Sequence, residues 1–236
     1  MGKTPEISVL MSVYNGKLYL REAIMSVLHQ SFTDFEFIIV NDGSTDESSS
    51  IIAEFKDARI VLIENHSNRG LIFSLNKGIS VSRGKYIARM DADDRCAPNR
   101  LAAQYEFMEA NPQIGLTGSD YINFSDTFSQ HCYTLKKSGI IKAWLLFTTS
   151  ICHPSVMMRS ETIRMHNLAY DDAFRYVEDY ELWTRFAMHS ELENLGAPLL
   201  FYRHHEAQVS QVSRNEQLRA SKEIQRSDRK STRLNS

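Results

Sequence analysis

The chain has 236 residues, of which 42% are hydrophobic and 24% charged, and its formal net charge is −2. This length suffices to bury the core of one large α/β domain or two small ones. The near-neutral charge gives no sign of a basic face, so we expect no nucleic-acid partner. The three cysteines, Cys96, Cys132 and Cys152, are odd in number and lack metal-ligand spacing, which indicates a reducing compartment without a disulfide framework.

The location of the protein follows from its apolar runs. None reaches the roughly 18–20 residues that cross a bilayer, and the run after residues 1–6 is too short for a signal peptide. We therefore expect a cytoplasmic protein, and leave open a peripheral contact with the inner face of the membrane. The oligomeric state is left open as well.

Strand and helix patterns alternate from residue 7 to residue 91. The segments that read as buried parallel strands are 7–13, 35–40, 59–63 and 86–91. Amphipathic helices are predicted between them, at about 18–30, after a capping box formed by Ser44 and Glu47, and from residue 71. This βαβαβαβ order predicts an α/β fold with a Rossmann-like, mostly parallel central sheet and helices on both faces.

The pattern changes after residue 97. We expect a helix over 98–111 with Pro98 in its first turn, a strand over 114–124, a polar loop over 125–139, a helix over 140–147, a strand over 156–159, a helix that starts at 177–185 and a strand over 199–203. The sequence thus predicts a single domain over 1–205, divided at about residue 97 into two halves.

Residues 206–236 read as a polar tail. A basic helix is expected over 215–226, and residues 231–236 have no core-forming pattern. We interpret the end of this tail as a truncation or read-through product and leave it out of the fold.

The motif Asp91-Ala92-Asp93 follows the fourth predicted strand. Alternation along a strand lets Asp91 and Asp93 point to one side, where two carboxylates form a hard-oxygen site for Mg²⁺ or Mn²⁺. The alternative is a polar turn that caps the next helix, and an isolated Asp-x-Asp favours it. Tyr14 and Asp42 follow the first two strands, however, and ligands gather at the carboxyl ends of strands in such sheets. This convergence favours the metal interpretation.

Nucleotide-binding motifs of the common kinds are missing from the sequence. No Gly-x-Gly-x-x-Gly follows the first strand, and no Gly-x-x-x-x-Gly-Lys-Ser/Thr occurs. A nucleotide could still be held by the ring of Tyr14, the carboxylate of Asp42 and a metal on its phosphates.

Several motifs together resemble a family 2 inverting glycosyltransferase with the GT-A fold, of the bacterial surface-glycan type. They are the run from Ser8 to Asn15, the run from Phe35 to Asp46, Asn68-Arg69-Gly70, Asp91-Ala92-Asp93 and Glu178-Asp179. The resemblance covers residues 7–205. Two positions depart from it, because Ser12 stands where many members have proline and Asn41 where they have a first aspartate. Asp42 is therefore the one carboxylate at that site.

The resemblance implies a role for each matching residue. Nucleotide-sugar binding is implied for Ser12, Val13, Tyr14, Asp42, Arg69 and Asp91, metal ligation for Asp93, Asp91 and His205, and general-base function for Asp179. The implied cofactor is Mn²⁺ or Mg²⁺ and the donor a nucleotide-diphosphate sugar. A C-terminal acceptor-binding subdomain would receive a glycan or lipid-linked glycan.

Structural alternatives remain for these residues. Glu178 and Asp179 also suit a helix N-terminus electrostatically, and Glu178 is expected to support Asp179 from behind. His204 competes with His205, and His153 is either an acceptor contact or a satisfied loop histidine.

Three functional alternatives also remain. A transferase of the same fold could use thymidine-diphosphate rhamnose instead of the more common uridine-diphosphate sugar. A nucleotidyltransferase would need a glycine-rich basic loop after the first strand, which is missing. A non-catalytic glycan-binding relative would be expected to have lost Asp93 or Asp179, and both are present.

Overall fold

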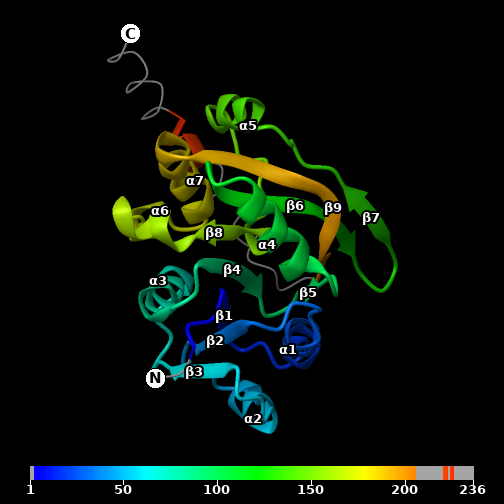
Figure 1. Ribbon diagram of the computed structural model, residues 1–236. Helices are drawn as coiled ribbons and strands as arrows, with labels where there is room; N and C mark the ends of the chain where they lie inside the picture. The colour runs from blue at the N-terminus through cyan, green and yellow to red at the C-terminus, as the bar shows by residue number, and fades with distance from the viewer. Residues whose placement is uncertain (1–2, 206–219, 223, 226–236) are drawn as a thin grey trace.

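The computed structural model describes residues 3–205, 220–222 and 224–225. These residues form a nine-stranded sheet in the order β3-β2-β1-β4-β8-β6-β9-β5, with β7 paired to β6 (Figure 1). The strands are β1 (Ile7–Val13), β2 (Phe35–Asn41), β3 (Ile60–Glu64), β4 (Tyr86–Asp91), β5 (Arg95–Cys96), β6 (Ile114–Phe124), β7 (Ser129–Cys132), β8 (Met157–Arg159) and β9 (Glu191–Arg203). The helices are α1 (Leu20–Leu28), α2 (Ser48–Glu54), α3 (Leu71–Val81), α4 (Arg100–Ala110), α5 (Ser138–Leu145), α6 (Ser160–Met165) and α7 (Glu178–His189), with short 3₁₀ turns η1 (His153–Ser155) and η2 (Asp172–Phe174).

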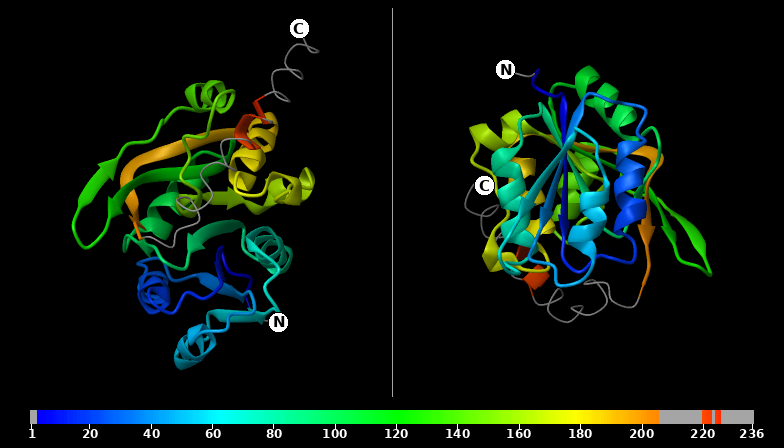
Figure 2. Two further views of the ribbon diagram at one scale, coloured as in Figure 1. Left: turned by 180° about the vertical axis from the view of Figure 1, so that it is seen from behind. Right: turned by 90° about the horizontal axis from the view of Figure 1, so that it is seen from below.

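The first half is the predicted parallel α/β unit. Strand β1 runs parallel to β2 and β4 on its two sides, and β2 runs parallel to β3. Alternate residues of β1 belong to different cores: Val9 and Met11 join the cluster under α1, and Leu10 joins the cluster under α3. Helix α3 consequently covers one face of the sheet, and α1 and α2 cover the other (Figure 2). This arrangement confirms the predicted fold class.

The second half turns the sheet into a mixed one. Strand β8 is antiparallel to both β4 and β6 and so joins the two halves. Strands β6 and β9 are parallel and paired over most of their length, although α5, α6 and α7 lie between them in the chain. The mostly parallel character expected from the sequence therefore belongs to the β3-β2-β1-β4 part.

Two buried side chains of α4 fasten the halves together. Arg100 donates to the carbonyl oxygens of Arg89 in β4, at 2.7 Å, and of Val156 just before β8, at 3.1 Å. Gln104 donates to the carbonyl of Ser155 at 2.8 Å. These bonds reach main-chain oxygens just beyond the β4–β8 pairing, where buried polar groups require partners.

The predicted capping box at the start of α2 is wrong. The helix begins at Ser48 and not after Ser44. The Ser44 hydroxyl accepts instead from the backbone N–H of Asn15 at 3.0 Å, and Asp46 accepts from the N–H of Ser48 at 3.0 Å. Ser44 thus serves the neighbouring strand-end loop, a tertiary contact that local sequence cannot reveal.

Other boundaries differ in the second half. Pro98 lies before the first turn of α4, whose N-cap is Asn99. The expected loop over 125–139 contains β7, which pairs with β6 as a hairpin. Helix α6 was not predicted, and β9 begins at Glu191, eight residues before the expected start at Leu199. The polar, exposed β7 has no hydrophobic alternation to signal it.

The described part of the C-terminal region packs against the domain. Ile224 is 2% exposed and belongs to the core cluster that includes Trp183. Gln225 donates to the carbonyl oxygen of Phe147. The expected basic helix over 215–226 lies mostly outside the described residues, and those described there are helical. No helix within the described ranges is long and apolar enough to cross a membrane.

Candidate functional site

The carboxyl ends of β1, β2 and β4 meet at one edge of the sheet. The register places Ser12 beside Asp91, and Val13 beside Asn41. Tyr14 and Asp42 are the next residues along β1 and β2. The parallel register therefore brings the three predicted polar clusters to one place, as the alternation of strands and helices indicated.

Asp42 organises the loops at this edge. Its carboxylate accepts hydrogen bonds from the backbone N–H groups of Arg69 at 3.0 Å and Gly70 at 2.8 Å, and from the side-chain amide of Asn65 at 2.7 Å. The side chain is 2% exposed. Asp42 thus holds the loop before α3 against β2 and faces the cleft from beneath.

The loop after β2 approaches the same segment closely. Gly43 has φ +69°, and a Cβ at this position would lie 2.5 Å from the carbonyl carbon of Ser67. Only glycine fits this left-handed conformation and this contact without strain. Asn15, also at positive φ, accepts from the N–H of Thr45 at 2.8 Å, so the loops after β1 and β2 are bonded together.

Three carboxylates gather where β4 ends. One ligand oxygen from each of Asp91, Asp93 and Asp94 lies within 4.8 Å of the others. His205 Nε2 lies 2.9 Å from Asp93 Oδ2. Hard oxygen ligands of this kind, with an imidazole at their edge, suit Mn²⁺ or Mg²⁺.

The end of β9 is fastened to this acidic loop by Arg203. Its backbone N–H donates to Asp94 Oδ1 at 2.8 Å, and its Nε donates to the carbonyl oxygen of Asp93 at 2.8 Å. The guanidinium also lies over the ring of Tyr19, 4.4 Å from its centroid. This anchoring carries His205, two residues on, to Asp93.

Burial and mutual repulsion perturb the carboxylates of the cluster. Burial raises the pKa of Asp91, and the negative charge of Asp93 raises it further, while Arg89 opposes both effects. The pKa of Asp94 is raised well above its usual range by burial and by the charges of Asp91 and Asp93. A divalent cation bound between these oxygens would relieve the repulsion among the carboxylates, so the donor set fits a metal.

A second acidic pair, Glu178 and Asp179, lies in the first turn of α7. Burial and the adjacent Asp179 raise the pKa of Glu178 to about 7. Burial also raises the pKa of Asp179, whereas the backbone N–H of Tyr180 and the charge of Arg89 lower it. A carboxylate with a raised pKa is suited to accept a proton near neutral pH.

One cleft of about 630 Å³ joins these features. Its lining includes Ser12, Tyr14, Asp42, Arg69, Asp91, Asp93, Arg175, Tyr176, Glu178 and His205. Polar and acidic groups therefore line the cleft together with two arginines, Arg69 and Arg175, a combination that suits a phosphorylated, hydroxyl-rich ligand.

The structure brings together seven of the predicted site residues. Ser12, Tyr14, Asp42, Arg69, Asp91, Asp93 and His205 all line the cleft. Val13 does not, because its side chain is buried in the core under α1. Asp179 is not part of the lining either, and Glu178 is, which reverses the expected order of the two.

Sequence reasoning did not single out three further residues of the site. Asp94 directly follows the Asp-x-Asp motif and is the most deeply buried of the three carboxylates. Arg175 lines the cleft from a loop whose sequence matches no recognisable motif. Arg89 is hydrogen-bonded to the carboxylate of Asp91. Strand alternation could have revealed Arg89, because it places residues 89 and 91 on one side of β4.

His153 is a satisfied histidine. Its Nε2 and the hydroxyl of Tyr170 are hydrogen-bonded at 2.8 Å, and its ring meets Trp183 edge-on. Burial lowers its pKa well below the usual range, so the ring is neutral. These contacts favour the structural alternative for this residue.

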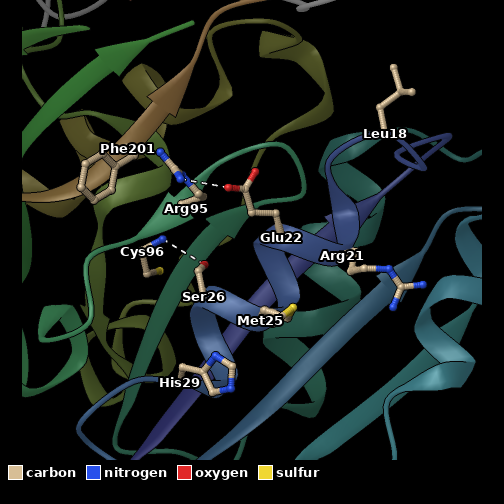
Figure 3. Close-up of a pocket in the computed structure, with 9 residues that line it drawn as sticks. All are labelled: Leu18, Arg21, Glu22, Met25, Ser26, His29, Arg95, Cys96 and Phe201. Carbon is tan, nitrogen blue, oxygen red and sulfur yellow. Dashed lines mark hydrogen bonds and ion pairs between the residues drawn. The ribbon is translucent and has the colours of Figure 1, made fainter. Parts of the chain in front are cut away.

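A second hollow, of about 530 Å³, lies between α1, β5 and β9 (Figure 3). Arg95 pairs with Glu22 at 2.9 Å, and the Cys96 N–H donates to Ser26 Oγ at 3.0 Å, so these polar groups are engaged with one another. None of the predicted site residues lines it. The first cleft is therefore the candidate active site.

Known structures share this fold. The S. aureus TarS 1–349 structure in complex with UDP aligns with a TM-score of 0.73 and 16% identity over 84% of this chain and 60% of TarS. The mannosyltransferase PcManGT from Pyrobaculum calidifontis, in complex with GDP-Man and Mn²⁺, aligns with a TM-score of 0.62 and 19% identity over 83% of this chain and 55% of its own. Both likenesses concern the fold.

Sequence comparisons reach further. An uncharacterized glycosyltransferase of Haemophilus influenzae is 34% identical over 243 aligned residues, which cover 96% of this chain and 74% of that protein. The family profile described as "Glycosyl transferase family 2" matches residues 8–166. With the cleft and its carboxylates, these matches show that the chain belongs to glycosyl transferase family 2.

Proposed function

We propose that this chain is an inverting, metal-assisted hexosyl- or N-acetylhexosaminyltransferase that uses a nucleotide-diphosphate sugar, with a uridine-diphosphate sugar as the main donor. The observation that carries the proposal is the cleft that Tyr14, Asp42, Asp91, Asp93 and Glu178 line together, with Asp94 close to the two aspartates. The cleft thus offers a site for the nucleobase of the donor, a site for its diphosphate and a site for the acceptor.

The donor end is assigned to the strand-end loops of the first half. Tyr14 is 48% exposed and would offer its ring to the nucleobase, with Ser12 beside it. Asp42 holds the segment that carries Arg69, whose guanidinium lies over the Phe73 ring at 4.2 Å and remains near the cleft for a phosphate. The neighbours with UDP and with GDP-Man bound support a nucleotide sugar as donor.

The cation would be held by Asp93, with Asp91 and His205 beside it. A bound Mn²⁺ or Mg²⁺ supplies charge that stabilises the leaving nucleoside diphosphate. The Asp93–His205 pair fixes the carboxylate for this purpose, and Arg203 fixes both through the loop. The Mn²⁺ of PcManGT supports the choice of a divalent cation.

Asp179 is proposed as the general base. An acceptor hydroxyl oxygen attacks the anomeric carbon as the bond to the diphosphate breaks, and its proton passes to the Asp179 carboxylate. The raised pKa of Asp179 suits this transfer. Glu178 lines the cleft more directly, so it is the competing candidate and has to be tested beside Asp179.

The acceptor is proposed to be a glycan or a lipid-linked glycan, bound by the half after residue 97. Arg175 and Tyr176 line this side of the cleft, and Tyr176 holds a positive φ of 72°, a strained conformation for an aromatic residue. A cytoplasmic protein with peripheral access to the membrane would meet such an acceptor.

The deciding experiment compares Asp179→Asn with Glu178→Gln. Asp179→Asn should lower transfer by about 10²–10⁴-fold while UDP binding in Mn²⁺ changes by less than about twofold, because the base contacts the acceptor. Glu178→Gln should retain most of the transfer rate. A full rate in Asp179→Asn with loss in Glu178→Gln would assign the base to Glu178 instead.

A donor screen separates the alternatives of the same fold. Thermal shift and sugar transfer with Mn²⁺ should show one donor that stands out, and thymidine-diphosphate rhamnose is the alternative to a uridine-diphosphate sugar. Donor binding without transfer to a proven acceptor would instead indicate a non-catalytic relative.

A further inference from the structure

Arg89 is a buried cation beneath the acidic cleft. It lies in β4 two residues before Asp91, and strand alternation points both side chains to one side. Its neighbours Ala88 and Met90 face the apolar cluster under α1 on the other side. Arg89 is 3% exposed, so its charge is held out of water and acts at full strength on its surroundings.

The Arg89 guanidinium engages both carboxylate oxygens of Asp91. Nη1 donates to Oδ2 at 2.6 Å, and Nη2 lies 2.5 Å from Oδ1. A two-pronged pair of this kind fixes the plane of the carboxylate, which a lysine ammonium cannot do. Asp91 is thereby held toward the cleft, and the guanidinium satisfies part of its capacity as a metal ligand.

The positive charge of Arg89 also affects carboxylates other than Asp91. It lowers the pKa of Asp94, Glu178 and Asp179, in each case against the effect of burial. Arg89 is therefore electrostatically linked to carboxylates on both sides of the cleft.

Arg100 shows what a purely structural buried arginine looks like here. It is 0% exposed, yet its partners are neutral: the carbonyl oxygens of Arg89 and Val156 and the side chain of Gln104. Among the described residues no ion pair joins it to a carboxylate. Arg100 is thus a matched control for Arg89, close by in the same core.

We infer that Arg89 is a positioning residue of the donor site, whose guanidinium fixes Asp91 for the nucleotide sugar and limits how strongly the carboxylate cluster attracts a divalent cation. The inference rests on the function proposed above. Removing the guanidinium has two opposite consequences. It frees Asp91, which weakens nucleotide binding, and it removes a positive charge beside the cation site, which strengthens binding of the cation alone. Loss of an arginine with only a structural role would lower the melting temperature and leave both affinities unchanged.

The test uses Arg89→Met, Arg89→Lys and Arg100→Met in the full chain. Mn²⁺ alone is titrated by electron paramagnetic resonance, and UDP or GDP, whichever the wild type binds more tightly, is titrated calorimetrically in saturating Mn²⁺. Arg89→Met should bind Mn²⁺ about tenfold more tightly and the nucleotide about tenfold more weakly. Arg89→Lys keeps the charge, so its Mn²⁺ affinity should stay within about twofold while nucleotide binding weakens about fivefold.

Arg100→Met should lower the melting temperature and leave both affinities unchanged. Because Arg89→Met leaves the Asp91 carboxylate without its partner, the double variant Arg89→Met/Asp91→Asn removes both charges and should recover melting temperature without recovering nucleotide binding. Unchanged or weaker Mn²⁺ binding in Arg89→Met, or wild-type nucleotide affinity in Arg89→Lys, overturns the inference. Absence of Mn²⁺ binding in the wild type overturns it too. A wild type that binds Mn²⁺ but neither nucleotide refutes the proposed donor, and the Mn²⁺ titrations alone then decide the role of Arg89.

Discussion

The two halves of the molecule contribute to the cleft in different ways. In the first half, loops at the ends of parallel strands satisfy their carboxylate: Asp42 accepts from two backbone N–H groups and one amide. In the second half, Glu178 is buried beside Asp179 and its pKa is raised to about 7. Asp42 is thus fixed by backbone donors of its loops, whereas burial and a neighbouring charge disfavour the ionised form of Glu178.

The physical origin of this difference is the local backbone. Parallel strands that end together place several loops side by side, and their N–H groups converge on one carboxylate. At the start of α7, burial and the like charge of Asp179 outweigh the backbone donors, so the pKa of Glu178 is raised. Four substitutions test this difference between the two halves, from the largest expected effect to the smallest.

Asp42→Ala should be the most damaging change in the first half. It leaves the N–H groups of Arg69 and Gly70 and the amide of Asn65 without their acceptor, which should lower the free energy of unfolding by about 2–4 kcal/mol. Urea denaturation measures this loss. The control is Glu47→Ala, an exposed carboxylate of the same loop that pairs with Lys17 at the surface, expected to cost less than about 1 kcal/mol. Equal losses in both variants would contradict the role of Asp42.

Glu178→Gln should change the pH dependence of stability. The folded pKa of about 7 exceeds the usual value of 4.5, so the carboxyl group contributes stability below about pH 4.5 that is lost as pH rises through about 7. From pH 4.5 to pH 8 the wild type should lose about 3 kcal/mol relative to Glu178→Gln. Denaturant titrations in EDTA at a series of pH values measure the difference. Parallel curves for the two proteins would show that Glu178 has an ordinary pKa.

His205→Ala should weaken Mn²⁺ binding by about 10–100-fold, the range for groups that orient a metal-ligating carboxylate. The reason is the 2.9 Å contact between His205 Nε2 and Asp93. Mn²⁺ titration measures it, with His204→Ala as the neighbouring control. If His204→Ala had the larger effect, the assignment of His205 would be wrong.

Tyr14→Ala should weaken UDP binding by about fivefold to tenfold, because an aromatic ring stacked on a base contributes about 1 kcal/mol or more. The half-exposed ring contributes little to packing. The melting temperature should therefore stay unchanged while calorimetry shows weaker binding. An unchanged UDP affinity would remove Tyr14 from the donor site.

The sequence by itself determined the first half. Buried strands that alternate with amphipathic helices have a single common solution, a parallel sheet, and in such a sheet Tyr14, Asp42 and Asp91 must meet at one edge. Each of these residues directly follows a strand that hydrophobic composition reveals. The sequence pattern that reveals the end of each strand therefore also reveals the residue that the strand contributes to the site.

Tertiary structure alone decided the second half and the details of charge. His205 reaches Asp93 only because β9 pairs with β6 and Arg203 fastens its end, contacts between segments far apart in the chain. Glu178 lines the cleft and Asp179 does not, which depends on how α7 is oriented about its axis. The ion pair between Arg89 and Asp91 depends on the burial of Arg89. Sequence patterns report which residues are apolar or acidic, whereas long-range packing determines which of the acidic residues remain in contact with the cleft and which cation lies beneath them.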